Sequence, residues 1–254
     1  MKLGFIGTGE ITKAVVSGII SSNIKFNRIY ISKRNSKISK QLQKKNSKII
    51  INSNNQTIIE NSDWIFLAIT PSVALKILKK FKFKKKQTII SFISTIKMKE
   101  LRKLIKVKAL IVRAIPLPPI SLKKGPVPIF PANKKVKHFF NKIGDCIEIK
   151  NENLSLNFWA TSSLMAPYYE LLNSVSKWLQ KKGVDKIKSQ KYVISLFLAL
   201  SENALSNSNR DLNILVKHSQ TPKGLNEQTL RFLINNKFYK SLNSSLNKIV
   251  SRLK

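Results

Sequence analysis

Residues 2–9, which read KLGFIGTG, decide the fold expected of this chain. The apolar residues up to Ile6 form a short run that is typical of a buried parallel strand, and the run ends in the turn Gly7-Thr8-Gly9. Apolar residues then recur at helical spacing from Ile11 to Ile20. A strand that passes through a glycine turn into a helix is typical of a dinucleotide-binding domain.

Each part of this turn has a role in holding a pyrophosphate. The first glycine permits the tight turn, the second lets the backbone approach the phosphates, and the helix start offers free N–H groups and a positive dipole end. Thr12 stands where the pattern often has a third glycine or alanine, so the helix and the strand must pack around a larger side chain. The alternative is a plain strand, turn and helix with incidental glycines. We predict cofactor contacts from Gly7, Thr8, Gly9, Glu10 and Ile11.

The end of the second predicted strand, residues 28–32, distinguishes the two nicotinamide cofactors. NAD-binding domains place an acidic side chain there to bond the ribose 2′-hydroxyl. Here the strand runs into Ser32-Lys33-Arg34-Asn35-Ser36, which contains no acidic residue. Arg34 is the strongest indication of an NADP site, because arginine is far rarer than lysine in this chain and a guanidinium suits a 2′-phosphate. The pattern predicts NADPH, bound through Ser32, Lys33 and Arg34.

The first part of the chain reads as an α/β domain. Strand and helix patterns alternate up to residue 150, which predicts a Rossmann-type, doubly wound parallel sheet. No strand is predicted in the proline-rich stretch 116–131, and a last strand is expected at 146–149. We predict an NADP-binding domain at residues 1–152.

The second part of the chain reads as an all-α domain at residues 153–254. Its apolar residues keep long helical spacing, and no strand pattern interrupts them. The main helices are expected at 164–179, 192–204 and 230–253.

The composition narrows the class of partner. No run approaches the roughly 18 apolar residues of a membrane span, and the first residues enter a glycine motif rather than a signal-peptide cleavage site. A net charge of +35 would by itself suggest a nucleic-acid-binding protein. Lysine is nevertheless spread through every segment, as an A/T-rich coding sequence favours, and no aromatic residues interleave with it in a recognisable binding motif. We expect small anionic ligands, and neither a membrane nor nucleic acid as the main partner.

Cysteine and histidine usage points to a cytoplasmic protein without a metal site. The single cysteine, Cys146, excludes an internal disulfide and suits a reducing compartment. The two histidines, His138 and His218, lie far apart and give no metal-ligand spacing.

Four segments in order resemble the pyrroline-5-carboxylate reductase family. They are the opening KLGFIGTG with Ser17-Gly18 behind it, the stretch from Asn55 through Asp63 to Pro71, Arg113-Ala114-Ile115-Pro116, and Gln220-Thr221-Pro222-Lys223-Gly224. The resemblance implies a cofactor domain followed by a helical domain that forms an intertwined dimer. It also implies hydride transfer from NADPH to a cyclic imine, by default pyrroline-5-carboxylate to proline in proline biosynthesis. Further cofactor contacts are implied at Asn55, Ala68, Ile69, Thr70 and Pro71.

The chain departs from the family pattern on the substrate side. Thr70 replaces the usual lysine before the proline, and Leu117-Pro118-Pro119 replaces an asparagine-threonine-proline continuation. The stretch 162–169 has lost its glycines, and Leu225-Asn226-Glu227-Gln228 replaces paired threonines. These changes leave the cofactor prediction intact and leave the substrate open.

Thr221, Asn226, Glu227 and Tyr168 are the candidate catalytic residues. Thr221 and Asn226, with backbone N–H groups around Gly224, offer donors to a substrate carboxylate or imine. Glu227 either pairs with an iminium nitrogen or caps the helix that follows. Tyr168 either presents its hydroxyl or packs in a core.

Arg113 stands at the carboxyl end of a predicted strand, where α/β proteins bind ligands. Pairing with a carboxylate across the domain boundary is the alternative role for this side chain.

Two other functions remain open. A 2-hydroxyacid-type dehydrogenase would need an asparagine one turn after Lys177, and the chain lacks it. A catalytically silent NADPH-binding regulatory protein would fit the altered substrate-side motifs.

Overall fold

The computed structural model describes residues 1–253 and separates the chain into two compact units. The first unit is Met1–Trp159, and the second begins at Ala160. The predicted boundary after residue 152 falls where the chain still packs on the first unit. The functional division into a cofactor domain and a substrate domain stays a prediction.

The first unit is built on one mixed sheet. Among residues 1–253, eight strands are hydrogen-bonded in the order β3-β2-β1-β4-β5-β6-β7-β8. The strands β1 to β6 pair in parallel, as predicted, and the strand order reverses at β1, which lies between β2 and β4. The strands are β1 (Lys2–Ile6), β2 (Arg28–Ser32), β3 (Ile49–Asn52), β4 (Trp64–Leu67), β5 (Thr88–Ser91), β6 (Leu110–Ala114), β7 (Pro126–Phe130) and β8 (Asp145–Glu148).

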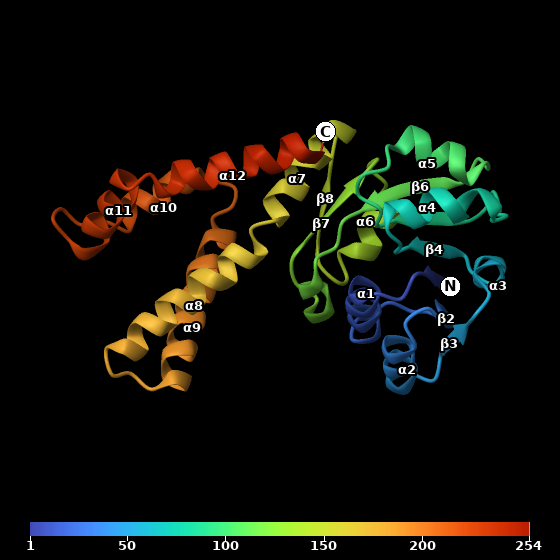
Figure 1. The fold of residues 1–254 in the computed structure, drawn as a ribbon, viewed down its shortest axis with the longest axis horizontal. Helices are drawn as coiled ribbons and strands as arrows, with labels where there is room; N and C mark the ends of the chain where they lie inside the picture. The colour runs from blue at the N-terminus through green and yellow to red at the C-terminus, as the bar shows by residue number, and fades with distance from the viewer. Residues whose placement is uncertain (254) are drawn as a thin grey trace. The chain divides into compact units, whose positions relative to one another are not determined.

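Helices cover both faces of the sheet, because its strands are apolar on both sides (Figure 1). One face carries α1 (Glu10–Ile20), α2 (Ser36–Lys45), α6 (Lys134–Phe140) and the 3-10 helix η2 (Pro118–Leu122). The other face carries α3 (Asn55–Glu60), α4 (Pro71–Ile77), α5 (Met98–Ile105) and the 3-10 helix η1 (Leu78–Lys80). The rings of Phe5 and Phe66 stack at 4.4 Å on the first face, while Ile6 and Leu67 are buried on the second. The predicted doubly wound fold is confirmed.

Strand β7 corrects the prediction for the proline-rich stretch 116–131. It runs antiparallel to β6 and parallel to β8, so the sheet is not wholly parallel. Prolines lack an N–H and are rare inside sheets, which is why the pattern did not indicate a strand. The strand tolerates Pro128 because its pairing with β6 is short and the carbonyl of Pro128 still accepts from the N–H of Ile115 at 3.1 Å.

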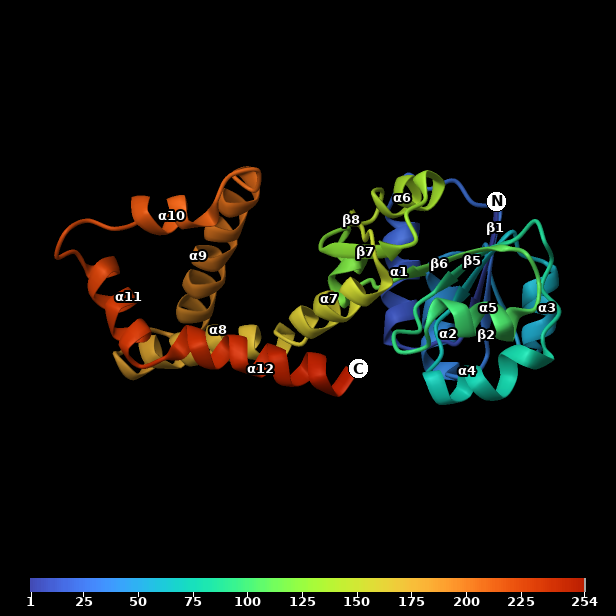
Figure 2. The same ribbon diagram turned by 90° about the horizontal axis from the view of Figure 1, so that it is seen from above.

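Within the described residues up to 253, every secondary-structure element of the second unit is a helix, as predicted. Helix α7 (Ser155–Ser162) crosses the boundary after the 3-10 helix η3 (Glu152–Leu154), and α8 (Met165–Lys181) and α9 (Lys186–Ser206) form a helical hairpin. The later helices are α10 (Leu212–His218), α11 (Leu225–Asn235) and α12 (Phe238–Leu253), with a turn between α11 and α12 (Figure 2). The single helix expected at 230–253 is therefore wrong. The chain turns at Lys237, whose φ is 57° and whose N–H donates to the carbonyl of Ile234 at 2.9 Å, so α11 ends before it.

The second unit leaves much apolar surface exposed. Trp178 is 58% exposed, Phe232 67% and Leu225 82%. Among residues 160–253, the apolar residues that are buried are Ala160 and Val193. One copy of this unit therefore buries little apolar surface by itself. No helix within residues 1–253 is long and apolar enough to cross a membrane.

Candidate dinucleotide site

The glycine turn between β1 and α1 forms an open cradle. Gly7 has a φ of +99°, and a Cβ on it would lie 2.2 Å from the carbonyl oxygen of Ala68, so only glycine fits there. Gly9 is the N-cap of α1, and a Cβ on it would meet nothing within 4 Å. Within the described residues no side chain caps this helix start. The first N–H groups of α1 and the positive end of its dipole are therefore available to an anion in this open space.

Three hydroxyl groups hold the turn in shape from inside. Thr12 donates to the carbonyl of Gly7 at 2.8 Å, which gives the larger side chain at that position a structural use. Thr8 donates to the carbonyl of Ser32. The buried Ser32 hydroxyl accepts from the N–H of Gly7 at 3.1 Å and donates to Asn55 Oδ1 at 2.7 Å. The end of β2 is thereby tied to the turn, and Ser32 acts here inside the protein. Its contact with a cofactor stays a prediction.

Two cavities of about 410 and 530 Å³ open beside the turn. Both are lined by Gly7, Arg34 and Ile69. Together they collect ten of the predicted cofactor residues, namely Gly7, Thr8, Gly9, Ser32, Lys33, Arg34, Asn55, Ala68, Ile69 and Thr70. Glu10, Ile11 and Pro71 lie next to this set in the chain but do not line either cavity.

Some lining residues were not predicted. Ser53 follows β3, and Val73 and Ile77 belong to α4. The carboxyl ends of parallel strands meet at one edge of the sheet, so the position of Ser53 directly after a strand was the available signal.

The charge around the cavities is positive. Lys33, Arg34 and Lys37 are exposed lining residues, and neither cavity has an acidic lining residue in the described part of the chain. Asn35 caps α2 by accepting from the N–H of Ile38 at 3.2 Å, so the start of a second helix lies beside these cations. The site suits a ligand with more than one phosphate group.

In the second unit, Glu227 lies in the first turn of α11 and contacts the loop before the helix. Its Oε2 accepts from the N–H of Lys223 at 2.6 Å, and its Oε1 pairs with Arg231 at 2.6 Å. Glu227 therefore makes structural contacts at the start of α11. The N–H of Gly224 is also in use, since it donates to the carbonyl of Thr221 at 2.8 Å. The N–H groups of Lys223 and Gly224 are thus used by the chain's own oxygen atoms, and the anion nest expected around Gly224 stays a prediction.

The other predicted substrate residues have structural contacts as well. Asn226 donates to the carbonyl of Ser219 at 2.7 Å and so holds the loop before α11. Tyr168 lies in α8, with its ring edge-on to Phe197 of α9 at 6.3 Å, and remains partly exposed. The catalytic roles of Thr221, Asn226, Glu227 and Tyr168 stay predictions.

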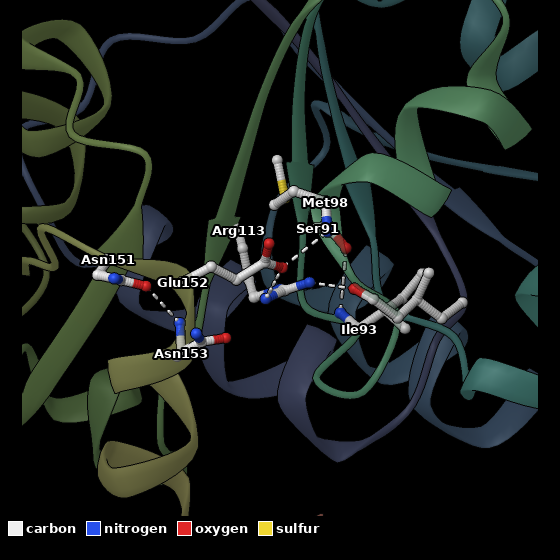
Figure 3. Close-up of polar contacts among 8 residues, drawn as sticks. Ser91, Ile93, Met98, Arg113, Asn151, Glu152 and Asn153 are labelled. Carbon is white, nitrogen blue, oxygen red and sulfur yellow. Dashed lines mark hydrogen bonds and ion pairs between the residues drawn. The ribbon is translucent and has the colours of Figure 1, made fainter. Parts of the chain in front are cut away.

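Two residues outside the cavities have defined environments. Arg113 pairs with Glu152 at 2.9 Å (Figure 3). Both residues belong to the first unit, so this pairing does not cross the boundary as the alternative role expected. Cys146 lies partly buried in β8, and burial, with a smaller effect of Glu148, raises the pKa of its thiol to about 11. The thiol is therefore protonated near neutral pH and is a poor nucleophile there.

Known proteins match this chain in sequence and in fold. Residues 2–95 match the family described as NADP oxidoreductase, coenzyme F420-dependent. Pyrroline-5-carboxylate reductase 2 of Bacillus subtilis is 23% identical over 250 residues, which are 95% of this chain and 90% of that protein.

Solved structures match over the same length. The 1-pyrroline-5-carboxylate reductase of Streptococcus pyogenes has a TM-score of 0.83 at 22% identity, over 100% of this chain and 98% of that chain. The Plasmodium falciparum pyrroline carboxylate reductase with NADP bound has a TM-score of 0.84 at 22% identity, over 100% and 97%.

The fold and the matches together support an NAD(P)-dependent oxidoreductase with a Rossmann-type first unit and a helical second unit. Within that class, the chain is similar over nearly its whole length to proteins named pyrroline-5-carboxylate reductase. The resemblance predicted from the four sequence segments is confirmed.

Proposed function

We propose that this protein is an NADPH-dependent reductase of a cyclic imine, with pyrroline-5-carboxylate as substrate and proline as product. The observation that carries the proposal is the open cradle at Gly9, beside the uncapped start of α1 and the cations Lys33, Arg34 and Lys37. A dinucleotide with an additional phosphate on its adenosine ribose matches this charge distribution better than NADH does.

Separate groups of residues serve the parts of the proposed cofactor. The N–H groups at the start of α1 hold the pyrophosphate, and Arg34 with Lys33 holds the 2′-phosphate. Thr8 and Ser32 keep the turn in the shape that this binding requires, because their hydroxyl groups are used inside it. Bound NADPH supplies the hydride, so the protein has only to orient the substrate and balance its charge.

For the substrate we propose the residues around the start of α11. Thr221 and Asn226 supply donors for the carboxylate, Glu227 supplies a negative charge near the iminium nitrogen, and Tyr168 supplies a hydroxyl group. The support is the full-length match to proteins named pyrroline-5-carboxylate reductase and the likeness of this loop to the family's substrate loop. Because Glu227 is paired with the exposed Arg231, its charge is held at the loop without being buried.

We further propose that the helical unit joins two or more copies of the chain in the cytoplasm. The support is the exposed apolar surface of α8 to α11, which includes Trp178, Leu198 and Phe232. Soluble monomers rarely expose so much apolar surface, and homo-oligomers bury it in symmetric interfaces.

The test is steady-state oxidation of NADPH by the purified protein with pyrroline-5-carboxylate. We expect turnover that requires both compounds and that falls strongly when NADH replaces NADPH. NADPH binding without turnover of this or any other small cyclic imine would defeat the reductase proposal and favour the silent NADPH-binding protein. Oxidation of a 2-hydroxy acid instead would favour the dehydrogenase.

A further inference from the structure

Arg113, the last residue but one of β6, lies on the row of residues at which the neighbouring parallel strands β1, β4 and β5 end. In the register of the sheet, Ile6 of β1 pairs with Leu67 of β4, Leu67 with Ser91 of β5, and Ser91 with Arg113 of β6. The glycine turn follows this row after β1, and the segment 92–97 follows it after β5. The two therefore emerge at the same edge of the sheet, and the cavity-lining residues that follow β4 emerge between them.

The side chains of Arg113 and Glu152 hold the far end of segment 92–97 (Figure 3). The Nη1 of Arg113 donates to Glu152 Oε1 at 2.9 Å, and its Nη2 donates to the carbonyl of Ile96. The same oxygen of Glu152 accepts from the N–H of Met98, the first residue of α5, at 2.7 Å. A carboxylate at this helix start is favourable, because the dipole of α5 is positive there.

The near end of the segment is held too. Ile93 donates from its N–H to the hydroxyl of Ser91 at 3.2 Å, and both Ile93 and Ile96 are buried. Between them, Thr95 is exposed and Ser94 is partly exposed. The segment therefore presents two hydroxyl-bearing residues at the edge of the sheet from a backbone that is fixed on both sides.

The ion pair has to be intact for this arrangement to hold. Arg113 is only 2% exposed, and its Nε is one of the buried polar atoms that have no partner in the described residues. Burial lowers the pKa of Arg113, while the charge and hydrogen bond of Glu152 act against that shift. Glu152 forms the ion pair with the guanidinium of Arg113. Removal of the negative charge of Glu152 would therefore leave this buried cation uncompensated.

We propose that Glu152 is a positioning residue of the cofactor site, which acts through Arg113 to fix segment 92–97 as the support for the nicotinamide half of the dinucleotide. The inference rests on the proposed function. Ligands of open α/β sheets bind along the carboxyl ends of the strands and across the point where strand order reverses. Arg34 assigns the adenosine half to the side of β2, so the other half extends past β4 toward β5.

The test compares two ligands on two matched variants. Glu152→Gln removes the charge and keeps the shape. Glu148→Gln is the control: it removes the charge of a comparably exposed carboxylate on β8. That carboxylate pairs with Lys137 of α6 at 2.8 Å. NADP⁺ carries both halves of the cofactor, and adenosine 2′,5′-bisphosphate carries only the adenosine half. We expect Glu152→Gln to raise the Kd of NADP⁺ about tenfold, as loss of a charged hydrogen-bond partner does, with the Kd of the bisphosphate unchanged. Glu148→Gln should change neither.

The outcomes separate the inference from the proposed function. If the wild-type protein binds neither ligand, the proposed cofactor is wrong and the inference falls with it. If the wild-type protein binds both and Glu152→Gln changes neither affinity, or both equally, the positioning role alone is refuted. Should Glu152→Gln fail to fold, Thr95→Trp serves instead, because Thr95 is exposed. That variant must weaken NADP⁺ and spare the bisphosphate, and equal affinities for NADP⁺ in variant and wild type would overturn the inference.

Discussion

The two glycines of the β1–α1 turn provide a matched pair of substitutions with opposite expected effects. Gly7→Ala places a methyl group 2.2 Å from the carbonyl oxygen of Ala68 and 2.8 Å from Ile69 Cγ2, at a φ of +99°. Positive φ costs an alanine about 1–3 kcal/mol, and overpacking against backbone adds about 1–3 kcal/mol. We expect Gly7→Ala to lower the free energy of unfolding by about 2–6 kcal/mol.

Gly9→Ala should affect binding rather than stability. Its methyl group meets no atom within 4 Å, and its φ of −99° is available to alanine. Alanine is a poorer N-cap than glycine, so we expect a loss of at most about 1 kcal/mol of stability. The same methyl group fills the cradle and keeps a pyrophosphate from the N–H groups of α1. Charged hydrogen bonds are worth about 1.5–3 kcal/mol, which corresponds to about 10- to 150-fold in the Kd of NADPH.

The assay is thermal unfolding of both variants together with titration of NADPH by its fluorescence. A 1 kcal/mol change shifts the melting temperature of a chain of this size by about 2–4 °C, so the two glycines are readily distinguished. Wild-type affinity for NADPH in a folded Gly9→Ala variant would refute the assignment of the cradle to the pyrophosphate.

Three further predictions concern charge, ionisation and assembly. Arg34→Ala should raise the Kd of NADPH about tenfold and leave the Kd of NADH within about twofold. Arg28→Ala, at the opposite end of β2, should change neither Kd. Equal losses of affinity for both cofactors would show that Arg34 does not bind the 2′-phosphate. Because the pKa of Cys146 is raised to about 11 from an ordinary 9.0, alkylation by iodoacetamide near pH 8 should be about 100-fold slower than for a free thiol. The stability contribution of this thiol is complete below pH 9 and is lost as the pH rises toward 11. Leu198→Asp on the exposed apolar side of α9 should reduce the molar mass measured by light scattering, and Asn203→Asp, on another side of the same helix, should not.

The sequence predicted the parts of the fold that depend on local pattern. The strand, glycine turn and helix of residues 2–20 could be predicted because each depends on local residue types, such as a glycine where φ is positive at Gly7. Strand β7 was not predicted because it contains two prolines, which are rare inside sheets, and because its pairing with β6 is short. The break at Lys237 was missed because helical spacing continues on both sides of one residue with positive φ.

In the candidate site, too, residues with a local sequence signal could be predicted, and contacts between residues far apart in the chain could not. Arg34 was predicted because an arginine directly after a strand, with no acidic residue beside it, is a local signal. The use of Ser32 inside the turn could not be predicted, because its partners Gly7 and Asn55 are 25 and 23 residues away in the chain. Glu152 could not be assigned to Arg113 for the same reason, since 39 residues separate them.

The central claim is that the protein transfers a hydride from NADPH to pyrroline-5-carboxylate. The most direct measurement is a reaction of the wild-type protein with NADPH that carries deuterium at both hydrogen positions of C4 of the nicotinamide, with mass analysis of the amino acid formed. The account predicts proline that contains deuterium, in an amount equal to the NADPH oxidised. NADPH that binds at the glycine turn and yields no labelled proline would contradict it.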